Sequence, residues 1–220
     1  VFVSWLPLYH DMGLIGAWLG SLYFAMPLVL MSPLAFLARP SRWLRTISRH
    51  RGTLTAAPNF AYELCAKKLD DADLAGLDLS SLRLALNGAE PVSQATLEAF
   101  IQRFVPHGLQ PEAITPVYGL AECSVGLAFP PLGRGPRIDA IRRDDFMNGK
   151  RALPAAEGEA GTMLLPACGR ALPGHEIRIV GKAGDELPDR QVGCLQFRGP
   201  SATRGYFRNP EATARLFRDG

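Results

Sequence analysis

The sequence predicts an α/β fold, in which a largely parallel sheet covered by helices is followed by a small β-rich subdomain. Up to residue 129, short apolar strands alternate with amphipathic helices, and Pro, Gly or polar turns bound each strand. After Pro166 the pattern becomes β, with alternating or apolar runs at 176–180 and 193–198. We therefore expect an α/β subdomain over 1–130, an insertion or connecting segment over 131–166, and a β-rich subdomain over 167–220.

The elements of the first part follow from hydrophobic periodicity. The expected strands are 1–5, 27–31, 54–57, 82–87 and 114–118, and the expected helices are 12–25, 41–50, 58–69 and 93–104. The uncharged apolar run 14–31 raises the question of a membrane span. Pro27 and Pro33 interrupt it and no basic cluster precedes it, so we expect a buried helix and an inner strand instead.

The segment from Pro130 to Pro166 has a different character. Pro, Gly, Ala and charged residues dominate it and no periodicity is visible, with only Ile138, Ile141, Phe146, Met147 and Leu153 available as apolar anchors. This composition predicts a long insertion or a flexible connection; an ordinary surface loop of variable length is the alternative.

Charge and cysteine usage exclude several classes of function. The net charge is only +3 and the basic residues are not interleaved with aromatic ones, so we expect no nucleic-acid partner. The four cysteines form no Cys-x-x-Cys pair, which argues against a zinc site or a disulfide framework and suits a reducing cytoplasm. The chain starts within a strand and without Met, so we expect a fragment of a longer protein without a signal peptide.

Three polar motifs follow expected strands. The first is Leu6-Pro7-Leu8-Tyr9-His10-Asp11-Met12-Gly13, the second is Asn87-Gly88-Ala89-Glu90-Pro91, and the third is Tyr118-Gly119-Leu120-Ala121-Glu122. The carboxyl ends of parallel strands meet at one edge of a sheet, where α/β proteins bind ligands. The sequence therefore predicts one site built from all three motifs.

These motifs resemble those of the adenylate-forming (AMP-binding) enzyme superfamily, and most of all those of the fatty acyl-AMP ligases. The likeness continues through Cys168–Gly174, Glu176–Val180, Arg198-Gly199-Pro200 and Gly205-Tyr206. It implies a central fragment of the large N-terminal domain of an enzyme that uses ATP and Mg²⁺ to convert a fatty acid to acyl-AMP and pyrophosphate. The acyl group then passes to the phosphopantetheine of an acyl carrier protein. The resemblance also implies that 1–130 is an α/β adenylation subdomain and that much of 134–165 is a segment inserted in the acyl-AMP ligases.

Two alternatives stay open at this point. One is an acyl-CoA synthetase, with CoA as acceptor, and the other is a non-catalytic nucleotide-binding module of a polyketide or peptide synthase. The superfamily's phosphate loop, its ribose-binding aspartate and the small domain with its catalytic lysine are not within these residues, so we expect the fragment alone to be inactive.

The resemblance also assigns roles to residues. Glu122 becomes the magnesium ligand, Tyr118 stacks on adenine beside Gly119, Leu120 and Ala121, and Gly88, Ala89, Glu90 and Pro91 line the other side of the base. His10 stabilises and positions phosphate or carboxylate oxygens and is not a general base, because a carboxylic acid is already ionised near neutral pH. The structural alternatives are a solvated carboxylate for Glu122, a core residue for Tyr118, a helix-entry residue for Glu90 and a helix cap for His10.

Two further groups of residues carry weaker signals. Met12, Leu14, Ile15, Trp18 and Leu19 either line an acyl tunnel or pack in the core, and large apolar residues at helical spacing are more often core. The five arginines of the 39–51 run either dock an acidic carrier protein or form a solvated helix face; they are Arg39, Arg42, Arg45, Arg49 and Arg51.

Overall fold

The computed structural model describes residues 1–217 and contains a five-stranded parallel sheet with the strand order β2-β1-β3-β4-β5. The strands are β1 (Phe2–Ser4), β2 (Leu28–Leu30), β3 (Leu54–Ala57), β4 (Leu84–Asn87) and β5 (Ile114–Pro116). All five lie within the ranges expected from the sequence. The α/β fold class is therefore confirmed.

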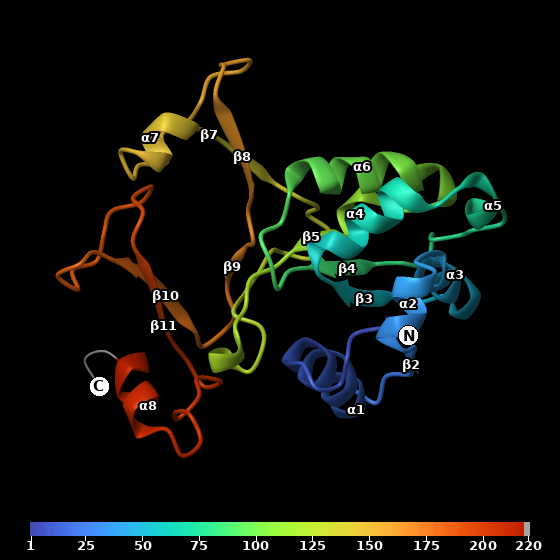
Figure 1. The fold of residues 1–220 in the computed structure, drawn as a ribbon, viewed down its shortest axis with the longest axis horizontal. Coiled ribbons are helices and arrows are strands. Elements are labelled where there is room, and N and C mark those ends of the chain that lie inside the picture. Colours follow the sequence, from blue (N-terminus) through green and yellow to red (C-terminus); the bar gives the residue numbers. More distant parts are fainter. Residues whose placement is uncertain (218–220) are drawn as a thin grey trace.

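Helices cover the sheet on one face more completely than on the other. The helices between strands are η1 (Met12–Leu19), α1 (Gly20–Tyr23), α2 (Pro33–Ala38), α3 (Ser41–His50), α4 (Asn59–Lys68), α5 (Asp71–Leu74) and α6 (Gln94–Phe104). Helices α4 and α6 lie along one face and α1 lies on the opposite side (Figure 1). The core between the first face and its helices is aromatic: Trp43 is fully buried, and its indole N–H donates to the hydroxyl of Thr55 at 2.9 Å.

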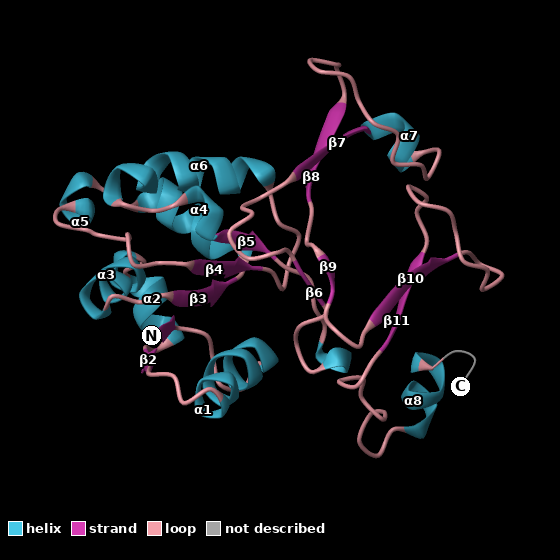
Figure 2. Cartoon of the chain, turned by 180° about the vertical axis from the view of Figure 1, so that it is seen from behind, coloured by secondary structure: helices cyan, strands magenta, loops and turns pink. Residues whose placement is uncertain are grey.

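The remaining chain forms small antiparallel pairs beside the sheet (Figure 2). These pairs are β6 (Ala128–Phe129) with β9 (Arg170–Ala171), β7 (Ile138–Arg142) with β8 (Thr162–Pro166), and β10 (Glu176–Val180) with β11 (Cys194–Arg198). The short helices after β5 are η4 (Ala121–Cys123), α7 (Arg143–Met147) and α8 (Pro210–Leu216), whereas η2 (Val105–His107) and η3 (Pro111–Ala113) lie between α6 and β5.

Residues 131–166 contain regular structure that no periodicity in the sequence indicated. Strands β7 and β8 pair over five residues each, with α7 between them, and Ile141 is fully buried. The pattern was hidden because each strand is short, β7 carries charges at Asp139 and Arg142, and its partner lies about 20 residues away along the chain. Long-range pairing of this kind leaves little local signal.

No helix within residues 1–217 is long and apolar enough to cross a lipid bilayer. The apolar run that raised this question folds as η1 and α1 and then the edge strand β2. Helix η1 is a π-helix, a rare form that recurs at functional sites. A Cβ at Gly13 in this helix would lie 2.2 Å from the carbonyl oxygen of Pro7, so only glycine allows the preceding loop to pack this closely.

Candidate functional site

The three predicted motifs meet around one cavity of about 500 Å³ at the carboxyl ends of the strands. His10, Asp11 and Met12 come from the segment after β1, Ala89 from the segment after β4, and the residues 118–121 from the segment after β5. A volume of this size lies within the range of small-molecule sites, roughly 300 to 1,000 Å³. The sheet topology therefore brings together segments that are up to about 110 residues apart in the sequence.

The wall of this cavity was not predicted from the sequence. One face of the sheet supplies it through residues that are neighbours in the strand register: Phe2 pairs with Leu54, Leu54 with Leu84, and Ala56 with Leu86. The available signal was the period of two along each strand, which places these side chains on one face. Of the five helix residues proposed for a tunnel, only Met12 lines the cavity, while Trp18 and Leu19 are about half exposed.

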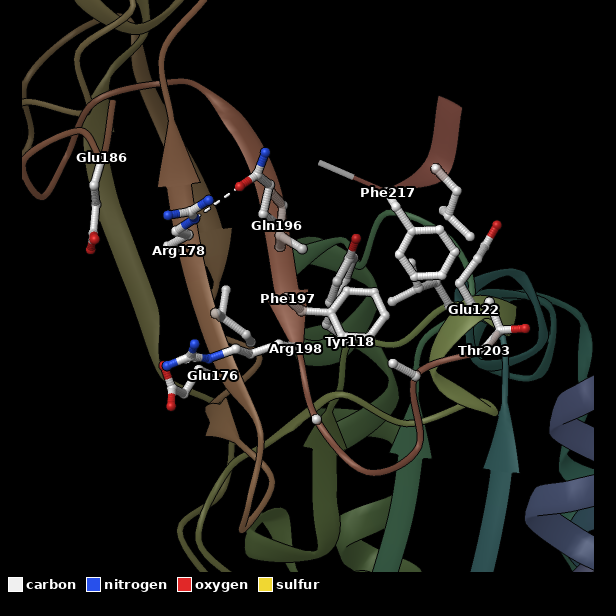
Figure 3. A pocket seen from close by; sticks show the side chains of 16 residues that line it. Tyr118, Glu122, Glu176, Arg178, Glu186, Gln196, Phe197, Arg198, Thr203 and Phe217 are labelled. Atoms are coloured by element: carbon white, nitrogen blue, oxygen red, sulfur yellow. Dashed lines mark hydrogen bonds and ion pairs between the residues drawn. The ribbon is translucent and has the colours of Figure 1, made fainter. Parts of the chain in front are cut away.

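A second cavity of about 810 Å³ lies on the other side of the Tyr118 motif (Figure 3). Tyr118, Leu120 and Glu122 line it together with side chains of β10 and β11, among them Arg178, which donates a hydrogen bond to Gln196 at 2.8 Å. Tyr118 and Leu120 line both cavities, whereas His10 lines only the smaller cavity and Glu122 only the larger one. The motif at the end of β5 thus separates an apolar space from one that is lined by both charged and apolar side chains.

The loop that carries Tyr118 and Glu122 is tightly folded. The backbone N–H of Tyr118 donates to the carbonyl of Ala128 at 3.1 Å, and a Cβ at Gly119 would lie 1.7 Å from the carbonyl oxygen of Val125. Only glycine fits there, as expected for a close backbone approach. Glu122 follows in the short helix η4, whose Ser124 end is in the left-handed region with φ +67°.

The Glu122 carboxylate is half-buried and has one protein partner within residues 1–217. Its Oε1 atom accepts a hydrogen bond of 2.5 Å from the hydroxyl of Tyr206. This bond to the carboxylate raises the pKa of Tyr206, because ionising the phenol would break the bond and place two negative charges together. Within residues 1–217, no group of three or more His, Cys, Asp or Glu side chains could hold a metal ion. A cation at Glu122 therefore needs further ligands from elsewhere.

His10 lies at the mouth of the smaller cavity with an exposed side chain. Its Nδ1 atom is 2.8 Å from Oδ1 of Asp11, and the N–H of Met12 donates to the same Asp11 oxygen at 2.7 Å. Asp11 therefore caps helix η1 and also fixes the imidazole. The Nδ1 atom of His10 also accepts from the Met12 N–H at 3.2 Å, so the contacts of the helix-cap alternative are present.

The segment after β4 divides into binding and structural positions. Gly88 is buried, and a Cβ there would lie 2.9 Å from the Val117 side chain, so glycine lets this backbone approach the neighbouring loop. Ala89 reaches the smaller cavity with φ +67°. Glu90 and Pro91 are exposed and line neither cavity; the Glu90 carboxylate instead accepts a hydrogen bond from the backbone of Phe60.

Four of the five arginines of the 39–51 run have partners within the fold. Arg39 pairs with Asp73 at 3.0 Å and Arg51 with Asp78 at 3.4 Å. Arg42 and Arg45 donate to backbone carbonyls of Ala35 and Ala72. Residues 70–78 thus supply the carboxylates that the arginine run itself lacks. Exposed ion pairs of this kind are typical of a solvated helix face.

The comparisons with known proteins agree with this geometry. Residues 1–207 match the family model of the AMP-binding enzymes. Over 213 residues the chain is 40% identical to a medium-chain-fatty-acid–[acyl-carrier-protein] ligase of Teredinibacter turnerae, covering 96% of this chain and 33% of that protein. It is 39% identical over 214 residues to a putative acyl-CoA synthetase of Caulobacter vibrioides, covering 97% of this chain and 37% of the relative.

Solved structures show the same relationship. A fatty acid AMP ligase from Legionella pneumophila superposes with a TM-score of 0.93 at 35% identity, covering 97% of this chain and 37% of that chain. A fatty acyl-adenylate ligase of the same organism, in complex with acyl adenylate and pyrophosphate, gives a TM-score of 0.91 at 35% identity, covering 96% and 37%. The chain belongs to the AMP-binding enzyme family, and the resemblance inferred from its motifs is confirmed. It spans less than two fifths of the length of these relatives.

Proposed function

We propose that this chain is part of a ligase that uses ATP to convert a fatty acid to acyl-AMP and pyrophosphate, and then transfers the acyl group to the phosphopantetheine thiol of an acyl carrier protein. The observation that carries the proposal is the single cavity at which the segments after β1, β4 and β5 converge, with an apolar wall on one side. Since the chain spans 33% and 37% of two relatives, we propose that residues 1–220 alone do not adenylate.

In this proposal different parts of the smaller cavity bind different parts of the acyl adenylate. Tyr118, with 39% of its surface exposed, offers its ring to adenine, and the backbone of Gly88 and Ala89 lines the other side of the base. The apolar cavity formed by the sheet face receives the acyl chain. His10 lies between the acyl cavity and solvent, where its imidazole stabilises negative oxygens as the bond to phosphorus forms.

Glu122 is the proposed magnesium ligand. Its Oε2 atom makes no hydrogen bond or ion pair within residues 1–217, so one carboxylate oxygen is available to a cation. Magnesium is commonly bound by one or two carboxylates together with substrate phosphates, which fits a site with a single acidic side chain. The ion would neutralise phosphate charge while the carboxylate of the fatty acid attacks the α-phosphorus.

We retain the division into 1–130, 131–166 and 167–220, with the middle part as an insertion. The support is that this part pairs with itself through β7 and β8 and also contacts its neighbours: Ala152 N–H donates to the Arg190 carbonyl at 2.8 Å, and Ala167 N–H donates to the Arg137 carbonyl at 2.8 Å. Strand β8 also lies against α6 of the α/β part. An insertion attached to the α/β part favours the acyl-AMP ligase over the CoA ligase, because it would limit the domain motion that CoA transfer uses. A cytoplasmic location is supported by free thiols at all four cysteines.

The test uses the full-length protein with ATP, Mg²⁺ and a medium-chain fatty acid, offered either CoA or a phosphopantetheinylated carrier, and follows products by mass spectrometry. Acyl-AMP with transfer to the carrier alone is the expected result, and Glu122→Gln should abolish it. Efficient acyl-CoA formation would replace the proposal by an acyl-CoA synthetase, as the name of the Caulobacter relative suggests for that protein. Nucleotide binding without pyrophosphate exchange would indicate a non-catalytic module.

A further inference from the structure

The segment 201–206 is bonded directly to the loop that carries Glu122. The backbone N–H of Thr203 donates to the Glu122 carbonyl at 2.7 Å, and the Ser201 hydroxyl donates to the Cys123 carbonyl at 3.0 Å. In the opposite direction, the Ser124 hydroxyl donates to the Ser201 carbonyl at 3.2 Å. The main chain of Glu122 and of the residue that follows it is therefore held by a segment that is distant in the sequence.

Tyr206 is the last residue of this segment, and contacts with α8 fix its position. Its backbone N–H donates to the Thr213 hydroxyl of α8 at 2.9 Å. The preceding Gly205 has φ +138°, and a Cβ there would lie 2.5 Å from the Thr213 side chain, so no other residue allows this approach. The Tyr206 ring is consequently directed back toward η4, where its hydroxyl meets Oε1 of Glu122 at 2.5 Å.

We propose that Tyr206 is a positioning residue for the magnesium site, which holds Oε1 of Glu122 so that only Oε2 is offered to the cation. The inference rests on the proposed magnesium role of Glu122. Magnesium demands near-octahedral geometry, and a carboxylate that binds through one oxygen fits this geometry better than one that chelates. Outer partners that hydrogen-bond to a ligating carboxylate fix its orientation, and their loss typically lowers metal affinity about 10- to 100-fold.

The measurement is the gain in ATP affinity that Mg²⁺ confers on the full-length protein. Calorimetric titrations with ATP, in chelator and in saturating Mg²⁺, give this gain as a ratio of dissociation constants. For Tyr206→Phe we expect the gain to fall about tenfold, with the affinity in chelator unchanged. Glu122→Gln should remove the gain, and adding Tyr206→Phe to it should have no further effect, because the hydroxyl acts through that carboxylate.

The matched control is Tyr23→Phe, which removes the same hydroxyl from α1, where Tyr23 is 84% exposed and lines neither cavity. It should leave the gain at the wild-type value. If Tyr206→Phe leaves the gain unchanged while Glu122→Gln removes it, the inference is wrong and the magnesium role of Glu122 stands. An equal loss of affinity in chelator and in Mg²⁺ would assign Tyr206 a purely structural role. If Glu122→Gln keeps the full gain, the magnesium role itself fails, and the inference fails with it.

Discussion

The carboxylate of Glu90 accepts a hydrogen bond of 2.6 Å from the backbone N–H of Phe60. Phe60 lies in the first turn of α4, where backbone N–H groups have no partner within the helix. Glu90 belongs to the loop after β4, so its side chain joins this loop to the N-terminus of α4 and supplies the negative charge that a helix N-terminus favours. The contact gives Glu90 a structural task beside the nucleotide role proposed for its loop.

We predict that Glu90→Ala destabilises the domain by about 1 kcal/mol, the usual cost of losing an N-terminal cap. Glu90→Gln keeps an oxygen acceptor without the charge, so it should cost less. The measurement is the thermal unfolding midpoint of the full-length protein. Equal midpoints for wild type and Glu90→Ala would contradict the capping role.

Gly119→Ala should disrupt the Tyr118 loop. The added Cβ would lie 1.7 Å from the Val125 carbonyl oxygen, so backbone must move, and we expect a loss of at least about 2 kcal/mol. The control is Gly16→Ala, because a Cβ at Gly16 meets nothing within 4 Å and alanine favours a helix. Chemical denaturation compares the two variants. A Gly119→Ala protein as stable as Gly16→Ala would show that the loop can rearrange freely.

Arg190 joins the insertion to the β-rich part, and Arg190→Ala should loosen this contact. The guanidinium donates to the Ala152 carbonyl at 2.8 Å and pairs with Asp139 at 3.2 Å. Because these groups are exposed, we expect a loss of no more than about 1 kcal/mol, yet faster hydrogen exchange at the Ala152 and Val192 amides. Arg215→Ala, which removes a local pair with Glu211 on α8, is the control. Identical exchange at both amides in the two variants would refute the prediction.

Asp73 should contribute to the pH dependence of stability. The Ser41 hydroxyl, at 2.8 Å, and then Arg39 hold the pKa of the Asp73 carboxyl below its usual value. A carboxyl whose folded pKa is lowered stabilises the fold above its unfolded pKa of about 3.9, and this stability is lost as the pH falls through the lower folded value. Thermal unfolding of Asp73→Asn should therefore differ from wild type near neutral pH and converge with it below about pH 4. A difference that stays constant with pH would rule this out.

Much of the α/β part could be predicted because its signal is local. The strand at 54–57 and the helices at 41–50 and 94–104 follow from apolar periodicity that a window of a few residues contains. The three motifs were visible because glycine and polar residues directly after apolar runs mark strand ends. Strands β7 and β8 were missed, since what stabilises them is pairing with each other.

The sequence by itself determined the family, the parallel sheet and the edge at which the motifs gather, because each depends on residue types at short spacing. Only the tertiary structure decided which residues meet across long separations. Strand register places Leu84 and Leu86 in the cavity wall. The tertiary structure also brings the Glu90 carboxylate to the N-terminus of α4 and the Tyr206 hydroxyl to Glu122. Such contacts depend on the direction of each side chain and on close approaches of the backbone, such as the one that Gly205 allows toward Thr213. A local sequence pattern predicts neither of them.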